Sequence, residues 1–200
     1  MSKRHGPNKE NLEATRQTFI DIATEEFTEY GYNQASTSRI VEHSGMARGS
    51  LYYHFGDKHG LFKAVYEDML AKALNTVSDK MEKQDNSWDA LLTGSQAFLD
   101  LCSEKPFRKI TLLESQSAIT FEERIALHKG TLLGKLQFLL NDLLNKGYFP
   151  GHTPQTITTF IFGILGEIGR SLDFSEDIAA DLNTYKQSFV LSIETLAKPS

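Results

Sequence analysis

Polar and basic side chains between Ser36 and Lys58 form the part of this sequence best suited to binding. Arg48 carries a planar fork of N–H donors that matches a phosphate group or the edge of a guanine base. Ser50, Tyr53 and His54 follow closely and add hydroxyl and imidazole groups that can bind sugar and phosphate oxygens. These residue types at helical spacing indicate a surface for nucleic acid.

Two short helices are predicted to position these side chains. Ile40 supplies an apolar contact on the first helix, and Leu51 and Phe55 do so on the second. Gly45 lies between them and permits a tight turn with positive φ. Two short helices joined through glycine are typical of a helix-turn-helix, whose second helix enters the major groove of DNA.

Further candidate contacts lie at the helix starts and on the second helix. Thr37 and Ser38 begin the first helix, where free N–H groups and the helix dipole favour a phosphate, and Lys58 begins the next helix. Gly49 has no side chain and permits a close approach of DNA. Tyr52 points either to the same surface or into the core.

The run from about Arg16 to Met69 resembles the DNA-binding domain of the tetracycline-repressor (TetR) family of bacterial regulators. The matching features are Ala23, Phe27, Gly31, Ser36-Thr37, Ile40, Gly45, Gly49-Ser-Leu-Tyr52, Tyr53-His-Phe55, Lys58 and Leu61. The resemblance implies operator contacts from Thr37, Ser38, Arg48, Gly49, Ser50, Tyr52, Tyr53, His54 and Lys58. Ala47 departs from the family pattern, in which a hydroxyl caps the recognition helix. We expect the missing hydroxyl to weaken that helix by about 1 kcal/mol.

The remaining sequence is also helical in pattern, so we expect an all-α protein of about nine helices. An N-terminal three-helix domain over residues 1–57 precedes a larger helical domain over 58–200. Expected helix boundaries are Gly31 as a stop, Asp57 and Ser87 as caps, a short helix from Pro106 to Ser115, a long one from Thr120 to Gly147 with a Thr120/Glu123 capping box, one from Thr153-Pro154, and one from Ser175.

The last two predicted helices carry a pattern that suits pairing with a second copy of the chain. Three glycines share one helical strip, and the final helix carries an apolar stripe. The predicted interface residues are Gly163, Gly166, Gly169, Tyr185, Phe189 and Ile193. TetR-like proteins dimerise in this way, and the resulting two-fold symmetry implies a near-palindromic operator with half-sites roughly 34–36 Å apart.

A ligand pocket is expected among the middle helices, with mostly apolar walls that suit an apolar or amphipathic effector. The candidate wall residues are Phe98, Cys102, Phe107, Leu113, Phe121, Ile125, His128, Leu132 and Phe162. Each of these side chains is alternatively plain core. Bound effector would shift the helix that begins at Lys58 and change the separation of the two recognition helices.

Composition sets limits on other functions. The net charge is -5, yet the stretch 43–55 carries Arg48 and no acid, and Lys3, Arg4 and Lys9 form a basic N-terminal arm. Acidic residues gather elsewhere, including Glu25, Glu26 and Glu29 on the first helix. A lone cysteine excludes an intrachain disulfide and fits a reducing compartment. Without a signal peptide or a membrane-length apolar run, we expect a cytoplasmic protein with no membrane partner.

Catalytic and metal sites find little support. His54 and His59, with Asp57 between them, have no third well-spaced ligand for a metal ion. The pair Glu122 and Glu123 fits the first turn of a helix, which favours carboxylates. We expect no catalytic residue, no metal and no cofactor.

The sequence therefore predicts a dimeric DNA-binding repressor that a small molecule releases from its operator. One alternative is a regulator of the same fold without a small-molecule inducer, acting as an activator or responding to a protein. The other alternative is a helical carrier that does not bind DNA.

Overall fold

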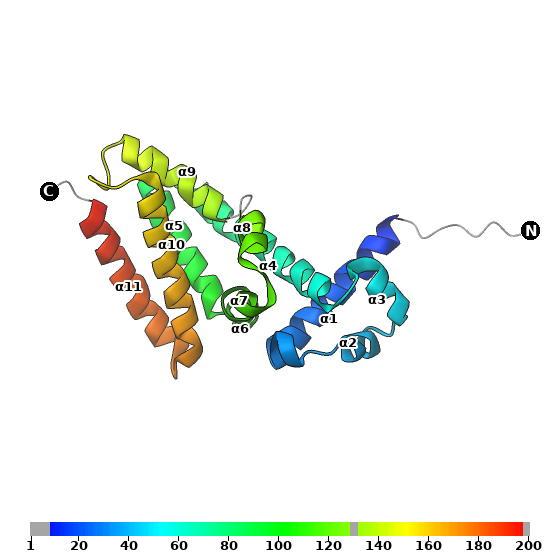
Figure 1. Ribbon diagram of the computed structural model, residues 1–200. Helices are drawn as coiled ribbons and strands as arrows, with labels where there is room; N and C mark the ends of the chain where they lie inside the picture. Colours follow the sequence, from blue (N-terminus) through cyan, green and yellow to red (C-terminus); the bar gives the residue numbers. More distant parts are fainter. Residues whose placement is uncertain (1–8, 129–131, 198–200) are drawn as a thin grey trace, which may run out of the picture. The chain divides into compact units, whose positions relative to one another are not determined.

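The computed structural model describes residues 9–128 and 132–197, except for the side chains of Lys9, Phe121, Ile125 and His128. All regular secondary structure in these residues is helical (Figure 1). The chain divides into two compact units, Met1–Asp68 and Met69–Ser200, so the division falls inside the helix α4 (Lys58–Met81). Among the described helices, none combines the length and the apolar character that crossing a bilayer requires.

Unit 1 packs its helices around aromatic side chains. Phe19, Ala23 and Phe27 are fully buried, as their spacing predicts, and the ring of Phe62 meets Phe27 edge-on with centroids 5.0 Å apart. Gly31 interrupts the first helix with a φ of 68°, although helical structure resumes as far as Gln34. The helices of unit 1 before α4 are α1 (Lys9–Gln34), α2 (Thr37–Ser44) and α3 (Arg48–Phe55).

A buried carboxylate joins α1 to α2. Glu26 is only 5% exposed, and its Oε1 accepts hydrogen bonds from the backbone N–H of Ser36 at 2.7 Å and from Nε of Arg39 at 2.8 Å. The Arg39 guanidinium also lies over the ring of Tyr30, 4.1 Å from its centroid. Glu26 therefore has a structural role that its place among other acidic residues on the first helix does not reveal.

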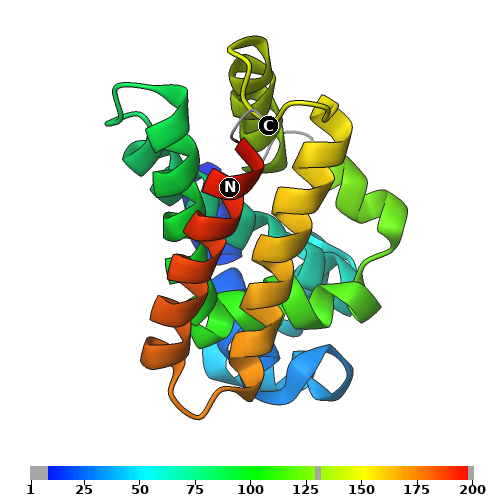
Figure 2. The same ribbon diagram turned by 90° about the vertical axis from the view of Figure 1, so that its left-hand side faces the viewer.

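Unit 2 is a bundle built around α5. Both α10 and α11 pack against α5, and α9 packs against α10 and α5. Figure 2 shows α10, in orange, and α11, in red, running side by side in opposite directions. The helices of unit 2 after α4 are α5 (Ser87–Ser103), α6 (Lys105–Phe107), the π-helix η1 (Arg108–Glu114), α7 (Ser115–Ala118), α8 (Phe121–His128), α9 (Leu132–Asn145), α10 (Pro154–Ser171), the 3₁₀ helix η2 (Leu172–Phe174) and α11 (Ile178–Ala197).

Several predicted helix starts are confirmed. The Asp57 carboxylate accepts the N–H of Gly60 at 2.7 Å, and Thr153 caps α10 with Pro154 in its first turn. At the start of α8, the Glu123 carboxylate accepts the N–H of Thr120 at 3.0 Å, which completes the predicted capping box.

Other predicted boundaries are wrong. Asn86, not Ser87, caps α5, because its side chain accepts the N–H of Asp89. The last helix begins at Ile178, after Asp177, whose carboxylate accepts the N–H of Ala180. The expected helix over 120–147 is described as α8 and α9, with residues 129–131 outside the described part, and the expected short helix becomes α6, η1 and α7.

Candidate nucleic-acid interface and candidate ligand cavity

Helix α3 presents one face to solvent and one to the core. Arg48, Gly49 and Tyr53 are exposed, and Tyr53 reaches 75%. Leu51 is fully buried, and the half-buried Phe55 meets Phe19 edge-on. The exposed face therefore carries a guanidinium and a phenol next to a bare stretch of backbone.

Tyr52 bonds both within α3, to Arg48, and to Thr37 at the start of α2. The Arg48 Nη2 donates a hydrogen bond to the Tyr52 hydroxyl at 3.2 Å. This bond, followed by one with Thr37, lowers the pKa of Tyr52. Because Tyr52 lies at the surface in this contact, it shares the face of Arg48 and Tyr53 and does not enter the core.

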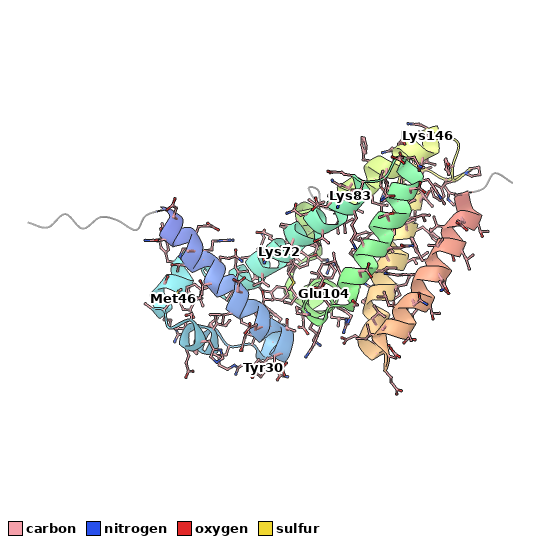
Figure 3. All side chains as sticks on the ribbon, turned by 180° about the vertical axis from the view of Figure 1, so that it is seen from behind. Tyr30, Met46, Lys72, Lys83, Glu104 and Lys146 are labelled. Atoms are coloured by element: carbon pink, nitrogen blue, oxygen red, sulfur yellow. The ribbon has the colours of Figure 1, made fainter. Side chains whose placement is uncertain are left out.

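The turn between α2 and α3 has the geometry expected from its glycine. Gly45 has a φ of 63°, in the left-handed region, and Met46 follows it half-buried in the turn (Figure 3). Ser36 caps α2 and leaves Thr37 and Ser38 in its first turn. Ala47 makes no side-chain bond at the start of α3, as its apolar side chain requires.

Gly49 has no packing reason to be glycine. A Cβ built on it would meet no atom within 4 Å, and its φ is not in the positive region. Glycine inside a helix costs about 1 kcal/mol of stability relative to alanine. No contact at this position offsets that cost.

Lys58 does not present a free ammonium group. Its Nζ donates to the backbone carbonyl of Asn33 at 3.0 Å and lies 5.0 Å from the centroid of the Tyr32 ring. Burial lowers the pKa of this lysine. Lys58 thus joins the start of α4 to the end of α1. Its assignment as a phosphate contact stays a prediction, because an ammonium group has further N–H donors beyond the one that binds Asn33.

Two other predicted contacts are half-buried. The ring of His54 packs between those of Tyr53 and Phe55, with centroids 5.3 Å and 5.9 Å away, and Ser50 lies on the same helix. The predicted basic arm of Lys3, Arg4 and the Lys9 side chain lies outside the described residues.

Unit 2 contains a small apolar cavity of about 50 Å³. Three of the predicted ligand residues line it: Phe98, Leu132 and Phe162. Other lining residues, among them Met81, Gly94, Ser95 and Lys135, were not predicted from the sequence. Their only signal was position on helices that also carry the apolar stripes, and such a signal does not separate a cavity wall from packed core.

The other predicted ligand residues form three groups. Cys102 and Phe107 are buried in a core cluster, and Leu113 does not line the cavity. Burial raises the pKa of the Cys102 thiol to about 12, so it stays protonated and unreactive at neutral pH. The side chains of Phe121, Ile125 and His128 lie outside the described residues.

The glycines of α10 have three different environments. A Cβ on Gly169 would lie 2.4 Å from Leu112 Cδ1 and 2.9 Å from Cys102 Sγ, so this glycine packs against its own chain. Gly166 is buried beneath the Arg170 side chain, whereas Gly163 is exposed with no atom near its missing Cβ. The sequence-derived strip therefore does not form one interface.

The predicted stripe on α11 also faces inward. Phe189 and Ile193 are buried in the core of unit 2, and Tyr185 packs half-buried against that core. The interface prediction is wrong for Gly169, Phe189 and Ile193, because a side chain covered by its own chain offers no surface to a partner. The large apolar residues that α10 and α11 do expose are Phe160 at 48% and Leu191 at 65%.

A helix-turn-helix in unit 1, followed by the separate helical bundle of unit 2, defines a class of DNA-binding helical proteins. The part of unit 1 that carries the helix-turn-helix is called the head below. Residues 19–65 match the family model described as bacterial regulatory proteins, tetR family, and residues 88–196 match the model described as tetracyclin repressor-like, C-terminal domain. The chain belongs to the tetracycline-repressor family.

Sequence relatives match mainly through the head. The chain is 38% identical over 65 residues to the HTH-type transcriptional repressor AcnR of Corynebacterium efficiens. The aligned segment covers 32% of this chain and 35% of that protein. It spans only about a third of that relative's length. The Transposon Tn10 TetC protein of Escherichia coli is 23% identical over 162 residues, 81% of each chain.

Solved structures match over nearly the whole chain. A TetR-family regulator from Pectobacterium atrosepticum has a TM-score of 0.77 and 25% identity, over 97% of this chain and 100% of that one. The regulator FadR from Bacillus subtilis, solved in complex with stearoyl-CoA, has a TM-score of 0.74 and 22% identity, over 87% and 97%. At 22% identity, the similarity to FadR is a similarity of fold.

Proposed function

We propose that this chain is a dimeric transcriptional repressor that binds a near-palindromic operator through α3 and is released by a small apolar or amphipathic effector. Family membership supports the class, and AcnR, which shares the head, is named as a repressor. The observation that carries the proposal is the exposed face of α3, where Arg48 and Tyr53 flank Gly49.

Gly49 supports a partner outside the chain. Among residues 9–128 and 132–197, no neighbouring atom requires a missing side chain at this position. Close approach of a sugar-phosphate backbone would require it, because a methyl group would separate α3 from the groove. The proposed contacts are Thr37, Ser38, Arg48, Gly49, Ser50, Tyr52, Tyr53, His54 and Lys58, whose ammonium also donates to the Asn33 carbonyl.

The proposed dimer uses the exposed faces of α10 and α11. Both helices pack on α5 with one side and run side by side (Figure 2). Phe160, Gly163 and Leu191 lie on their exposed sides, where a second copy would bury them. Two-fold symmetry of this pairing would match two half-sites of an operator.

The proposed effector site is the apolar cavity of unit 2. FadR, a protein of the same fold, is solved with a bound acyl-CoA, which supports a ligand role for this unit. Helix α4 contributes Val77 and Met81 to the cavity wall, and its first residues belong to unit 1. We propose that bound effector displaces α4 and changes the separation of the two α3 helices in the dimer.

The test is operator binding by matched variants. Fragments selected from genomic DNA with the wild-type protein would serve as probe in a gel-shift titration. Arg48→Ala should weaken binding by about tenfold or more, since a bidentate base contact contributes roughly 1–3 kcal/mol. Lys83→Ala, which removes the same charge from an exposed site after α4, should leave binding unchanged (Figure 3).

Gly49→Ala gives an independent test, because it should stabilise α3 and still weaken operator binding. A wild-type protein without sequence-selective, salt-dependent DNA binding would contradict the proposal.

A further inference from the structure

The cavity of unit 2 adjoins an open groove. The groove holds about 400 Å³ and shares Met81, Ala90, Lys135 and Leu139 with the cavity wall. The cavity alone, at about 50 Å³, is far smaller than the roughly 300 Å³ or more of a usual ligand pocket, so the groove must supply the remaining room.

The Met81 side chain lies where the two spaces meet. A Cβ on Gly94 would be 2.8 Å from both Cγ and Sδ of Met81, so the thioether packs directly on the bare backbone of α5. Methionine is unbranched and flexible, and it changes rotamer at low cost. Moving this one side chain would join the cavity to the groove.

The walls favour an alkyl chain. In the described part of the chain, the residues lining the cavity are apolar or lack a side chain, apart from Ser95 and Lys135. Phe138, which is 75% exposed on α9, extends the apolar surface along the groove. A flexible chain of methylene groups fits a narrow cavity that opens into a longer apolar groove.

Lys135 supplies a positive charge where the cavity and the groove adjoin, and such a charge favours a ligand with a negatively charged head group. It lines both spaces, and its Nζ donates to the Glu82 carboxylate at 3.1 Å. Glu82 is mostly exposed, and a surface ion pair of this kind contributes no more than about 1 kcal/mol. A carboxylate on the ligand can therefore replace Glu82 as the partner of Lys135 with little loss.

We propose that the effector is an alkyl-chain carboxylate, whose chain displaces Met81 to enter the cavity and whose head group pairs with Lys135. This inference rests on the proposed function, because it specifies the ligand of the same effector site.

The test is calorimetric titration of the full-length chain with decanoate, decanol and decylamine, below their micelle-forming concentrations. Wild-type protein should bind decanoate about five- to tenfold more tightly than decanol, and decylamine most weakly. Lys135→Met should abolish this preference, because it should weaken decanoate binding more than it changes decanol binding. Lys146→Met, which removes a lysine paired with Asp142 elsewhere in unit 2, should retain it.

Met81→Ala tests the role of the thioether. Removing the side chain that must be displaced should tighten binding of decanol and decanoate alike by about threefold. An unchanged affinity in Met81→Ala, or a carboxylate preference that survives Lys135→Met, would overturn the inference.

Operator binding measured on the same samples separates the two proposals. Wild-type protein that retains operator but binds no decyl compound contradicts the effector class alone. Wild-type protein that binds decanoate with the predicted preference but no operator contradicts the proposed function.

Discussion

The two units hold their shape by different means. In unit 1, single polar groups add to the aromatic core and fix where helices meet or begin: the Glu26 carboxylate joins α2 to α1, and the Asp57 carboxylate caps α4. In unit 2, apolar side chains from α5, α9, α10 and α11 share the stabilisation among many contacts. A surface that must match a rigid partner requires exact helix positions, whereas a cavity wall tolerates rearrangement.

This contrast predicts that single substitutions at tie points harm unit 1 more than comparable changes harm unit 2. It also predicts that residues close in sequence differ sharply in effect, according to what each one touches. The four predictions that follow test it from the largest expected effect to the smallest.

Gly60→Ala should have the largest effect. A Cβ at this position would lie 2.0 Å from the backbone carbonyl oxygen of Phe55, and backbone cannot move aside as a flexible side chain can. We expect the free energy of unfolding to fall by about 3 kcal/mol, measured by urea denaturation followed by circular dichroism. The control is Gly49→Ala, which should raise stability by up to about 1 kcal/mol. Equal midpoints for the two variants would contradict the account.

Glu26→Gln should destabilise unit 1 by about 2 kcal/mol, because the amide cannot supply the charge-assisted bonds that the carboxylate makes with Ser36 and Arg39. Operator affinity should fall with it, since α2 loses its tie. The matched control is Glu25→Gln, which neutralises the exposed neighbouring acid on the same helix. A midpoint shift no larger than that of the control would remove Glu26 from the set of tie points.

Gly169→Ala and Gly163→Ala compare two positions of α10. The first should cost about 1–2 kcal/mol, because its methyl group would overlap Leu112 and Cys102, which have some freedom to move. The second meets no atom and should be neutral or slightly stabilising within the monomer. Thermal unfolding of both proteins at one concentration checks this, and the reverse order would place Gly169 at a surface.

Ala47→Ser should have the smallest effect, a gain of about 1 kcal/mol in the local stability of α3, because a hydroxyl at this position can accept a free N–H of the first turn. Amide hydrogen exchange of residues 48–52 should slow relative to wild type. Ala47→Val, which lacks the hydroxyl, is the control and should not slow it. Exchange that is equally slow in both variants would show that the missing cap does not limit this helix.

The sequence predicted the head of the molecule nearly residue by residue because its signals are local. The positive φ of Gly45 and the uncapped Ala47 each depend on a few consecutive residues. Glu26 escaped prediction because its partners, Ser36 and Arg39, are brought to it by the fold. An acidic residue among other acids gives no sign that it is buried.

The bundle was less predictable for the same reason. Helical periodicity identifies an apolar stripe, but it does not say whether that stripe faces the chain's own core or a second subunit. Phe189 and Ile193 were assigned to an interface and lie in the core. The cavity likewise depends on packing between α4, α5, α9 and α10, and only three of its predicted residues line it.

Footprinting of the wild-type protein on a selected genomic fragment tests the central claim most directly. A dimer that reads DNA through two α3 helices should protect two symmetric patches of backbone, with centres about 34 Å apart and thus one helical turn. Arg48→Ala should lose both patches together, because the two copies of the substitution act on equivalent half-sites. A single asymmetric patch, or protection that ignores sequence, would contradict the account.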